Sequence, residues 1–200
     1  MERDRLRRWA LRLEYVTIGW NVGEVVVTIV LGVLARSLAL VAFGLDAVIE
    51  IFASGAVVAH LREHEPPPES LARTHRHIGL SFLALAVVLA IGAIVSLANR
   101  HEPDESIVGI VYLAMATVAM LSLAIAKRRI ALRLGDGPLA AEAGVTYLDA
   151  ALAASILTAL VLNAVAGWWW VDAVATLVVA AVAANEGRES FEDARKALET

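Results

Sequence analysis

The sequence contains no cysteine, which excludes disulfide bonds and thiolate metal sites. Any metal site must therefore use carboxylate, imidazole, amide or backbone oxygen ligands. The chain also lacks a cluster of basic residues interleaved with aromatic ones, so nucleic-acid binding is not expected. No small-residue cleavage site follows a short apolar stretch near the N-terminus. We therefore interpret the first apolar stretch as a spanning segment and not as a cleaved signal peptide.

Long apolar segments dominate the 200 residues, of which 59% are hydrophobic, more than a soluble domain carries. About 20 residues cross a bilayer as a helix. The sequence predicts an all-α membrane protein with six transmembrane helices, at roughly 11–34, 37–60, 78–98, 106–126, 139–163 and 168–187. Residues 1–10 form a cytoplasmic N-terminal segment, 11–187 the transmembrane domain and 188–200 a short cytoplasmic tail.

Basic residues gather at both ends of the chain and in alternate connections, and the opposite side has only Arg36 and Arg100. Because basic loops stay in the cytoplasm, this asymmetry places both termini there. The expected location is a plasma membrane, such as a bacterial inner membrane.

Charge is scarce within the predicted spans, so the exceptions are informative. Asp46 and Glu50 lie in a stretch from Ser37 to Ala59 that has no other charge. They are four residues apart and so face the same side of a helix. A charged side chain at mid-bilayer costs at least roughly 2.5–3.5 kcal/mol, which makes an intramembrane acid a candidate functional residue.

Polar stripes also mark the first and fifth segments, and chain direction places Glu24 and Asp149 near the depth of Asp46 and Glu50. The stripes comprise Glu14, Thr17, Asn21, Glu24 and Thr28 in the first segment, and Glu142, Thr146 and Asp149 in the fifth. At 1.5 Å per residue, Glu142 lies about 10 Å closer to the cytoplasm than Asp149.

Four acids at one depth need a counter-charge, and we expect no Lys or Arg at that depth within any span to supply it. Protons or a cation must then relieve their repulsion. We expect Asp46, Glu50, Asp149 and Glu24 to hold a divalent metal ion. Asn21 and Glu142 are expected along its pathway. The alternative is that these acids join helices by hydrogen bonds to Ser, Thr or Asn.

The stretch from Gly32 through Ser37-Leu-Ala-Leu40 to Asp46 and Glu50 resembles the cation diffusion facilitator family. Its signature there is a glycine, then Ser-Leu-Ala-Leu, then two acids or a histidine and an acid four apart. The end of the chain, from Gly167-Trp-Trp-Trp to Arg188, resembles that family's sixth helix.

This resemblance implies proton-coupled efflux of a divalent transition metal, commonly zinc, by a homodimer. It also implies a core of helices one, two, four and five, with three and six outside. Val145 stands where the family has its fourth ligand, and Phe43 where it often has Asp. An all-oxygen site suits harder ions, so manganese, iron and magnesium stay open beside zinc. We expect the chain to fall in the family's membrane-only branch, without a soluble C-terminal domain.

Four histidines lie in or beside the connection after the second span: His60, His64, His75 and His77. Neutral imidazole is a common zinc ligand. Two interpretations stay open, an accessory metal site and a solvated, proline-broken linker.

Two other functions compete with metal transport. A proton-coupled exporter of organic cations also needs membrane acids. Aromatic residues beside them would favour it, and only Phe43 and Tyr147 are expected near them. An intramembrane enzyme needs catalytic motifs that no span contains, so we expect no enzymatic activity.

Overall fold

The computed structural model describes residues 2–34, 38–63, 67–99, 107–168 and 170–199. Over these residues the chain is all-helical. The helices are α1 (Glu2–Leu34), α2 (Leu38–Arg62), α3 (Pro68–Asn99), α4 (Ile107–Leu134), α5 (Gly137–Ala166) and α6 (Val171–Glu199).

Five of the described helices, α1 to α5, are long and apolar enough to cross a membrane. The chain is thus a multi-pass membrane protein. The sixth helix, α6, carries Asp172 in its first turn, is apolar from Ala173 to Ala184 apart from Thr176, and is charged beyond that, so the sixth span stays a prediction. Several helices also continue past the predicted spans, because the polar segments at their ends keep a helical conformation. The expected tail, 188–200, is helical through Glu199.

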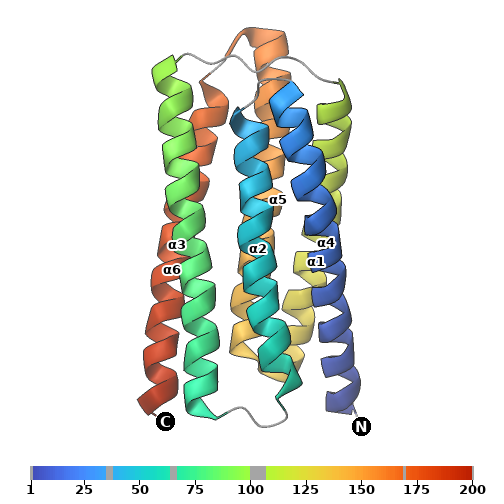
Figure 1. The fold of residues 1–200 in the computed structure, drawn as a ribbon, viewed down its shortest axis with the longest axis vertical. Helices are drawn as coiled ribbons and strands as arrows, with labels where there is room; N and C mark the ends of the chain where they lie inside the picture. The colour runs from blue at the N-terminus through green and yellow to red at the C-terminus, as the bar shows by residue number, and fades with distance from the viewer. Residues whose placement is uncertain (1, 35–37, 64–66, 100–106, 169, 200) are drawn as a thin grey trace.

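The helices stand side by side as three pairs, with α3 and α6 on one side, α2 and α5 in the middle, and α1 and α4 on the other side (Figure 1). Both chain ends lie at the same end of the bundle, which we call the terminal end. Helices α1, α2, α4 and α5 contact one another as a four-helix core, and the α3–α6 pair packs against α2 and α5. The predicted division into core and outer helices is therefore correct.

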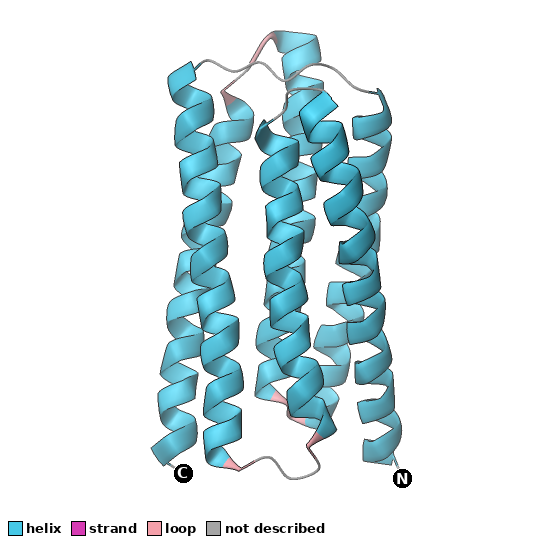
Figure 2. Cartoon of the chain, viewed as in Figure 1, coloured by secondary structure: helices cyan, strands magenta, loops and turns pink. Residues whose placement is uncertain are grey.

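The described part of the chain is drawn as long helices and short loops (Figure 2), and helix α1 illustrates how the polar stripes organise the core. Its inward face is polar along most of its length, whereas valines such as Val22 and Val26 are more than half exposed. Lipid is as apolar as valine, so helix association in a membrane depends on close packing and on polar contacts. The buried residues of α1 are Ala10, Glu14, Thr17, Asn21, Glu24, Thr28 and Gly32.

The outer pair associates in a different way, through a close approach of two backbones. A Cβ atom on Gly79 of α3 would lie 3.1 Å from the carbonyl oxygen of Gly187 in α6, and the reciprocal distance is also 3.1 Å. Small residues at such a crossing let the helices meet at van der Waals contact.

Candidate functional site

Four carboxyl side chains converge in the middle of the core, and we call them the central cluster: Glu24 of α1, Asp46 and Glu50 of α2, and Asp149 of α5. All four are at most 1% exposed. Each interacts electrostatically with others of the set. The structure therefore brings the acids of three helices together, as their helical spacing predicts.

The central cluster contains many carboxylate oxygens without partners. Asp46 and Asp149 lie beside each other, close enough to share a hydrogen bond when one of them is protonated. Among the described residues, their four oxygens accept no hydrogen bond from any other group. Leaving buried charged groups unsatisfied is costly. The arrangement is therefore suited to positive charge or to protons.

Aromatic side chains flank one member of the central cluster. The indole Nε1 of Trp20 donates a hydrogen bond of 2.6 Å to Glu24 Oε2, and the phenol of Tyr112 lies within hydrogen-bonding reach of Glu24. The two aromatics expected near the acids differ in position. Phe43 is fully buried, and Tyr147 is 37% exposed.

The carboxylates do not form a closed metal site in this conformation. Within the part of the chain that the structure describes, no three His, Cys, Asp or Glu side chains are placed to hold one metal ion. Val145, at the position of the family's fourth ligand, is buried in the apolar core and offers no donor. A bound ion would require the acids to approach further.

A second buried group lies nearer the terminal end, and we call it the terminal cluster: Glu14, Lys127 and Glu142. The ammonium Nζ of Lys127 lies 2.6 Å from Glu142 Oε1 and 3.3 Å from Glu14 Oε2. All three side chains are fully buried. The expectation that no Lys or Arg would lie among the membrane acids is therefore wrong. Helix α4 continues to Leu134, so Lys127 lies within the bundle and not in a loop.

Hydroxyl groups surround this ion pair. Ser54 Oγ donates to Glu142 Oε1 at 2.8 Å, and Lys127 Nζ donates to Thr146 Oγ1 at 3.1 Å. Thr146 in turn donates a short hydrogen bond to Glu50 Oε1. Glu50 thereby connects the terminal cluster to the central cluster, and Asn21 lies beside Glu50. Asn21 and Glu142 thus lie along one continuous polar path through the core.

Helical phase in α4 could have identified Lys127. The buried positions of that helix recur at intervals of three or four residues, and Lys127 falls on the same face. The neighbouring Arg128 and Arg129 are exposed. The predicted span ends at residue 126 and places all three basic residues in a loop. The sequence prediction therefore does not separate the buried Lys127 from its exposed neighbours. The buried residues on this face include Leu113, Ala116, Met120, Ala124, Lys127 and Ala131.

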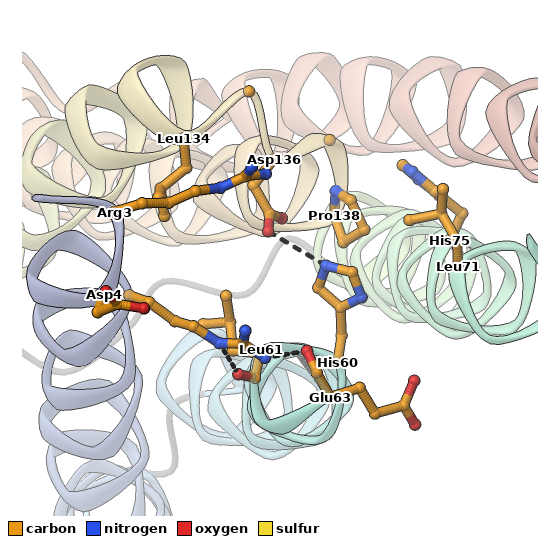
Figure 3. A pocket seen from close by; sticks show the side chains of 13 residues that line it. Arg3, Asp4, His60, Leu61, Glu63, Leu71, His75, Leu134, Asp136 and Pro138 are labelled. Carbon is orange, nitrogen blue, oxygen red and sulfur yellow. Dashed lines mark hydrogen bonds and ion pairs between the residues drawn. The ribbon is translucent and has the colours of Figure 1, made fainter. Parts of the chain in front are cut away.

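The predicted histidine site is only partly assembled. His60 of α2 and His75 of α3 are both buried and line one cavity of about 450 Å³ at the terminal end (Figure 3). His60 Nε2 lies 3.1 Å from Asp136 Oδ2. His77 lines a different cavity, between α2 and α3, because residues two apart on a helix point in different directions. His64 lies outside the described residues.

Asp136 links this cavity to the turn between α4 and α5. Gly135 ends α4 with a φ of 66°, a conformation that glycine adopts easily. Asp136 Oδ1 then accepts a hydrogen bond of 3.0 Å from the backbone N–H of Leu139 and caps α5. Burial raises the pKa of Asp136, but hydrogen bonds from His60 and Leu139 outweigh it and hold the pKa below its usual value.

Neither a family model nor a curated protein sequence matches this chain. The likeness to the cation diffusion facilitators is therefore carried only by the residues quoted for it above. Function has to be argued from the buried polar groups themselves.

Proposed function

We propose that this protein is a proton-coupled transporter of divalent metal cations, exporting zinc or a related transition metal through its four-helix core. The observation that carries the proposal is the central cluster, in which four buried carboxyl groups from three helices form no ion pair with a cationic side chain of the described residues. Manganese, iron and magnesium remain candidate substrates because all the donors are oxygen atoms.

The central acids supply both halves of such an exchange. When protonated, they are neutral and tolerate burial. When deprotonated, they need a cation to offset their mutual repulsion. Binding a dication at Asp46, Glu50 and Asp149 would therefore release protons, and reprotonation would release the ion. Because the three acids are not closed around one point in this conformation, the cycle needs a second, tighter arrangement of α2 and α5.

Orientation and assembly are parts of the same proposal. Basic residues at the terminal end favour a cytoplasmic location for both chain ends, so outward transport runs from the terminal cluster toward the central one. We propose a homodimer, as the family resemblance implies. One face of both α3 and α6 is already used within the chain, so only their remaining lipid-facing surfaces are free to form the interface.

Zinc flux into proteoliposomes tests the proposal. Asp46→Asn and Asp149→Asn keep the side-chain shape and remove the charge, and we expect either change to abolish flux. Glu192→Gln, which changes a half-exposed acid on α6, is the matched control and should transport normally. Unchanged flux in both aspartate variants would refute the assignment.

A proton-coupled exporter of organic cations is the second candidate, and the aromatic contacts of Glu24 favour it. Indole and phenol rings attract organic cations through their faces. If organic cations are the substrate, Trp20→Leu should weaken binding of a lipophilic cation such as tetraphenylphosphonium. If they are not, the same change should leave zinc binding unchanged. Calorimetry with each ligand separates the two functions.

A further inference from the structure

The terminal cluster has more oxygen ligands than its single cation uses. The ammonium of Lys127 has three protons, and its neighbours are Glu142 Oε1, Thr146 Oγ1 and Glu14 Oε2. In the described part of the chain, Glu14 Oε1 and Glu142 Oε2 are buried and accept no hydrogen bond. Two carboxylates thus face one monovalent charge, and two of their oxygens remain unused.

Charge balance is incomplete in the same place. Glu14 and Glu142 lie beside each other, close enough to share a hydrogen bond when one of them is protonated, and Lys127 offsets only one of their two negative charges when both are ionised. Glu50 adds a third carboxylate through Thr146. A dication between Glu14 and Glu142 would neutralise the pair completely. Away from water, such a difference in charge is worth far more than at a surface.

We propose that Glu14 and Glu142, with the hydroxyls of Ser54 and Thr146, form a second cation site in which the Lys127 ammonium takes the place of a divalent metal ion. Two carboxylates, two hydroxyls and retained water suit a hard, hydrated dication of the Mn²⁺ or Mg²⁺ class. The ion would bind here when the lysine side chain moves aside, toward the terminal end of the bundle.

The proposal builds on the transport function, because this site lies on the polar path that leads to Glu50. Lys127 would then act as a specificity-determining residue. Replacing the ammonium by a monovalent ion leaves the charge of the site unchanged. Replacing it by a dication adds one positive charge. A purely structural ion pair would instead stay closed at every metal concentration.

Removing the lysine is the first test, with Mn²⁺ as the probe and bound metal counted by electron paramagnetic resonance. At Mn²⁺ concentrations too low to displace the lysine of the wild type, Lys127→Met should bind one more Mn²⁺ per chain than the wild type, and adding Glu14→Gln and Glu142→Gln should remove that extra ion. Lys127→Arg keeps the charge and should gain none. An unchanged Mn²⁺ count in Lys127→Met, or an extra ion that survives the double glutamine change, would overturn the proposal.

The same count distinguishes this site from the central one. In an Asp46→Asn/Asp149→Asn background, Lys127→Met should still gain its extra Mn²⁺ ion. If that ion persists but the wild type does not transport zinc, the transport function is refuted and the second site is supported. Loss of the gain in this background would overturn the second site as an independent one.

Should Lys127→Met fail to fold, labelling of the wild-type protein decides the question. The chain has two lysines, Lys127 and Lys196, and Lys196 is an exposed internal reference at 71%. A small amine-reactive reagent with mass-spectrometric mapping should label Lys127 several-fold faster as Mn²⁺ is raised, with Lys196 unchanged. No Mn²⁺-dependent change at Lys127 would overturn the proposal.

Discussion

The central and terminal clusters both contain carboxyl groups carried by α1 and α5, yet they differ in one respect. Glu14 and Glu142 share the ammonium of Lys127, whereas Asp46 and Asp149 share no cation among the described residues. Removing one partner of a buried pair destabilises the folded state because the other charge is left uncompensated. An acid that has no partner destabilises that state unless something else binds it.

Under the proposed function, this difference explains how one bundle can be stable and still bind a mobile ion. The terminal cluster joins α1, α2, α4 and α5 through one set of hydrogen bonds and ion pairs. The central cluster is left with unsatisfied oxygens that a mobile ion or a proton can satisfy. Sequence spacing alone does not distinguish the two clusters. They differ in whether a facing helix carries a cationic side chain.

The largest expected contrast is in stability without metal. Glu142→Gln removes the closer partner of Lys127 and should lower the free energy of unfolding by about 3 kcal/mol, the lower end for a broken buried pair because Glu14 remains. Asp46→Asn should be neutral or stabilising, since it removes an uncompensated acid. Thermal unfolding in detergent measures both. Equal losses in the two variants would remove the distinction between the clusters.

The next contrast is in metal affinity. Asp149→Asn should weaken zinc binding by at least about 10- to 100-fold, the range seen even for residues that only support metal ligands. Glu14→Gln should leave the affinity of the central cluster nearly unchanged, because Lys127 can still pair with Glu142. Calorimetry on the purified protein measures both constants, and a larger loss in Glu14→Gln would reverse their assigned roles.

Helix spacing next to the central cluster provides a third contrast. A Cβ atom on Gly44 would lie 2.5 Å from Thr28 Oγ1 and 3.1 Å from Ile29 Cγ1, whereas one on Gly55 meets nothing within 4 Å. Gly44→Ala should therefore force α1 and α2 apart, at about 1–3 kcal/mol, and reduce transport because Asp46 follows two residues later. Gly55→Ala, on the same helix, should be stabilising by up to about 1 kcal/mol. Unfolding curves of the two variants that coincide would contradict the packing argument.

The smallest effect is expected at Asp136, outside both clusters. Asp136→Ala should cost about 1–2 kcal/mol through loss of the α5 cap and of the His60 contact, whereas Asp136→Asn can keep the cap. The pKa of Asp136 is lowered in the folded state. Its charge therefore stabilises the protein above about pH 4, the usual pKa, and this contribution is lost as the pH falls through the lowered value.

Unfolding of the wild type and of Asp136→Asn, compared across the acid range, checks that sign. The stability difference should shrink as the pH falls below about 4. A difference that grows toward acid pH would mean that the carboxylate is not held ionised by His60.

Much of the fold follows from the sequence because the polar stripes keep a strict helical period. Glu14, Asn21 and Glu24 all face inward as their spacing predicts. The core of α1, α2, α4 and α5 is expected from the family resemblance, and the stripes on α1, α2 and α5 agree with it. The membrane supplies the reason, since polar groups away from lipid must face protein.

The pairing of acids with partners could not be predicted in the same way. Whether Lys127 belongs to a loop or to the core depends on how far α4 continues, and helix ends are set by the turn at Gly135 and Asp136. The separation of His75 from His77 has a similar origin, because α3 begins at Pro68 and carries both on different faces.

The most direct test follows zinc and protons together in the same proteoliposomes, with a zinc dye and a pH dye. The account predicts that wild-type protein moves protons opposite to zinc, and that Asp46→Asn/Asp149→Asn abolishes both fluxes while Glu192→Gln preserves them. Zinc movement that persists in the double variant, or that proceeds without any proton movement, would contradict the account.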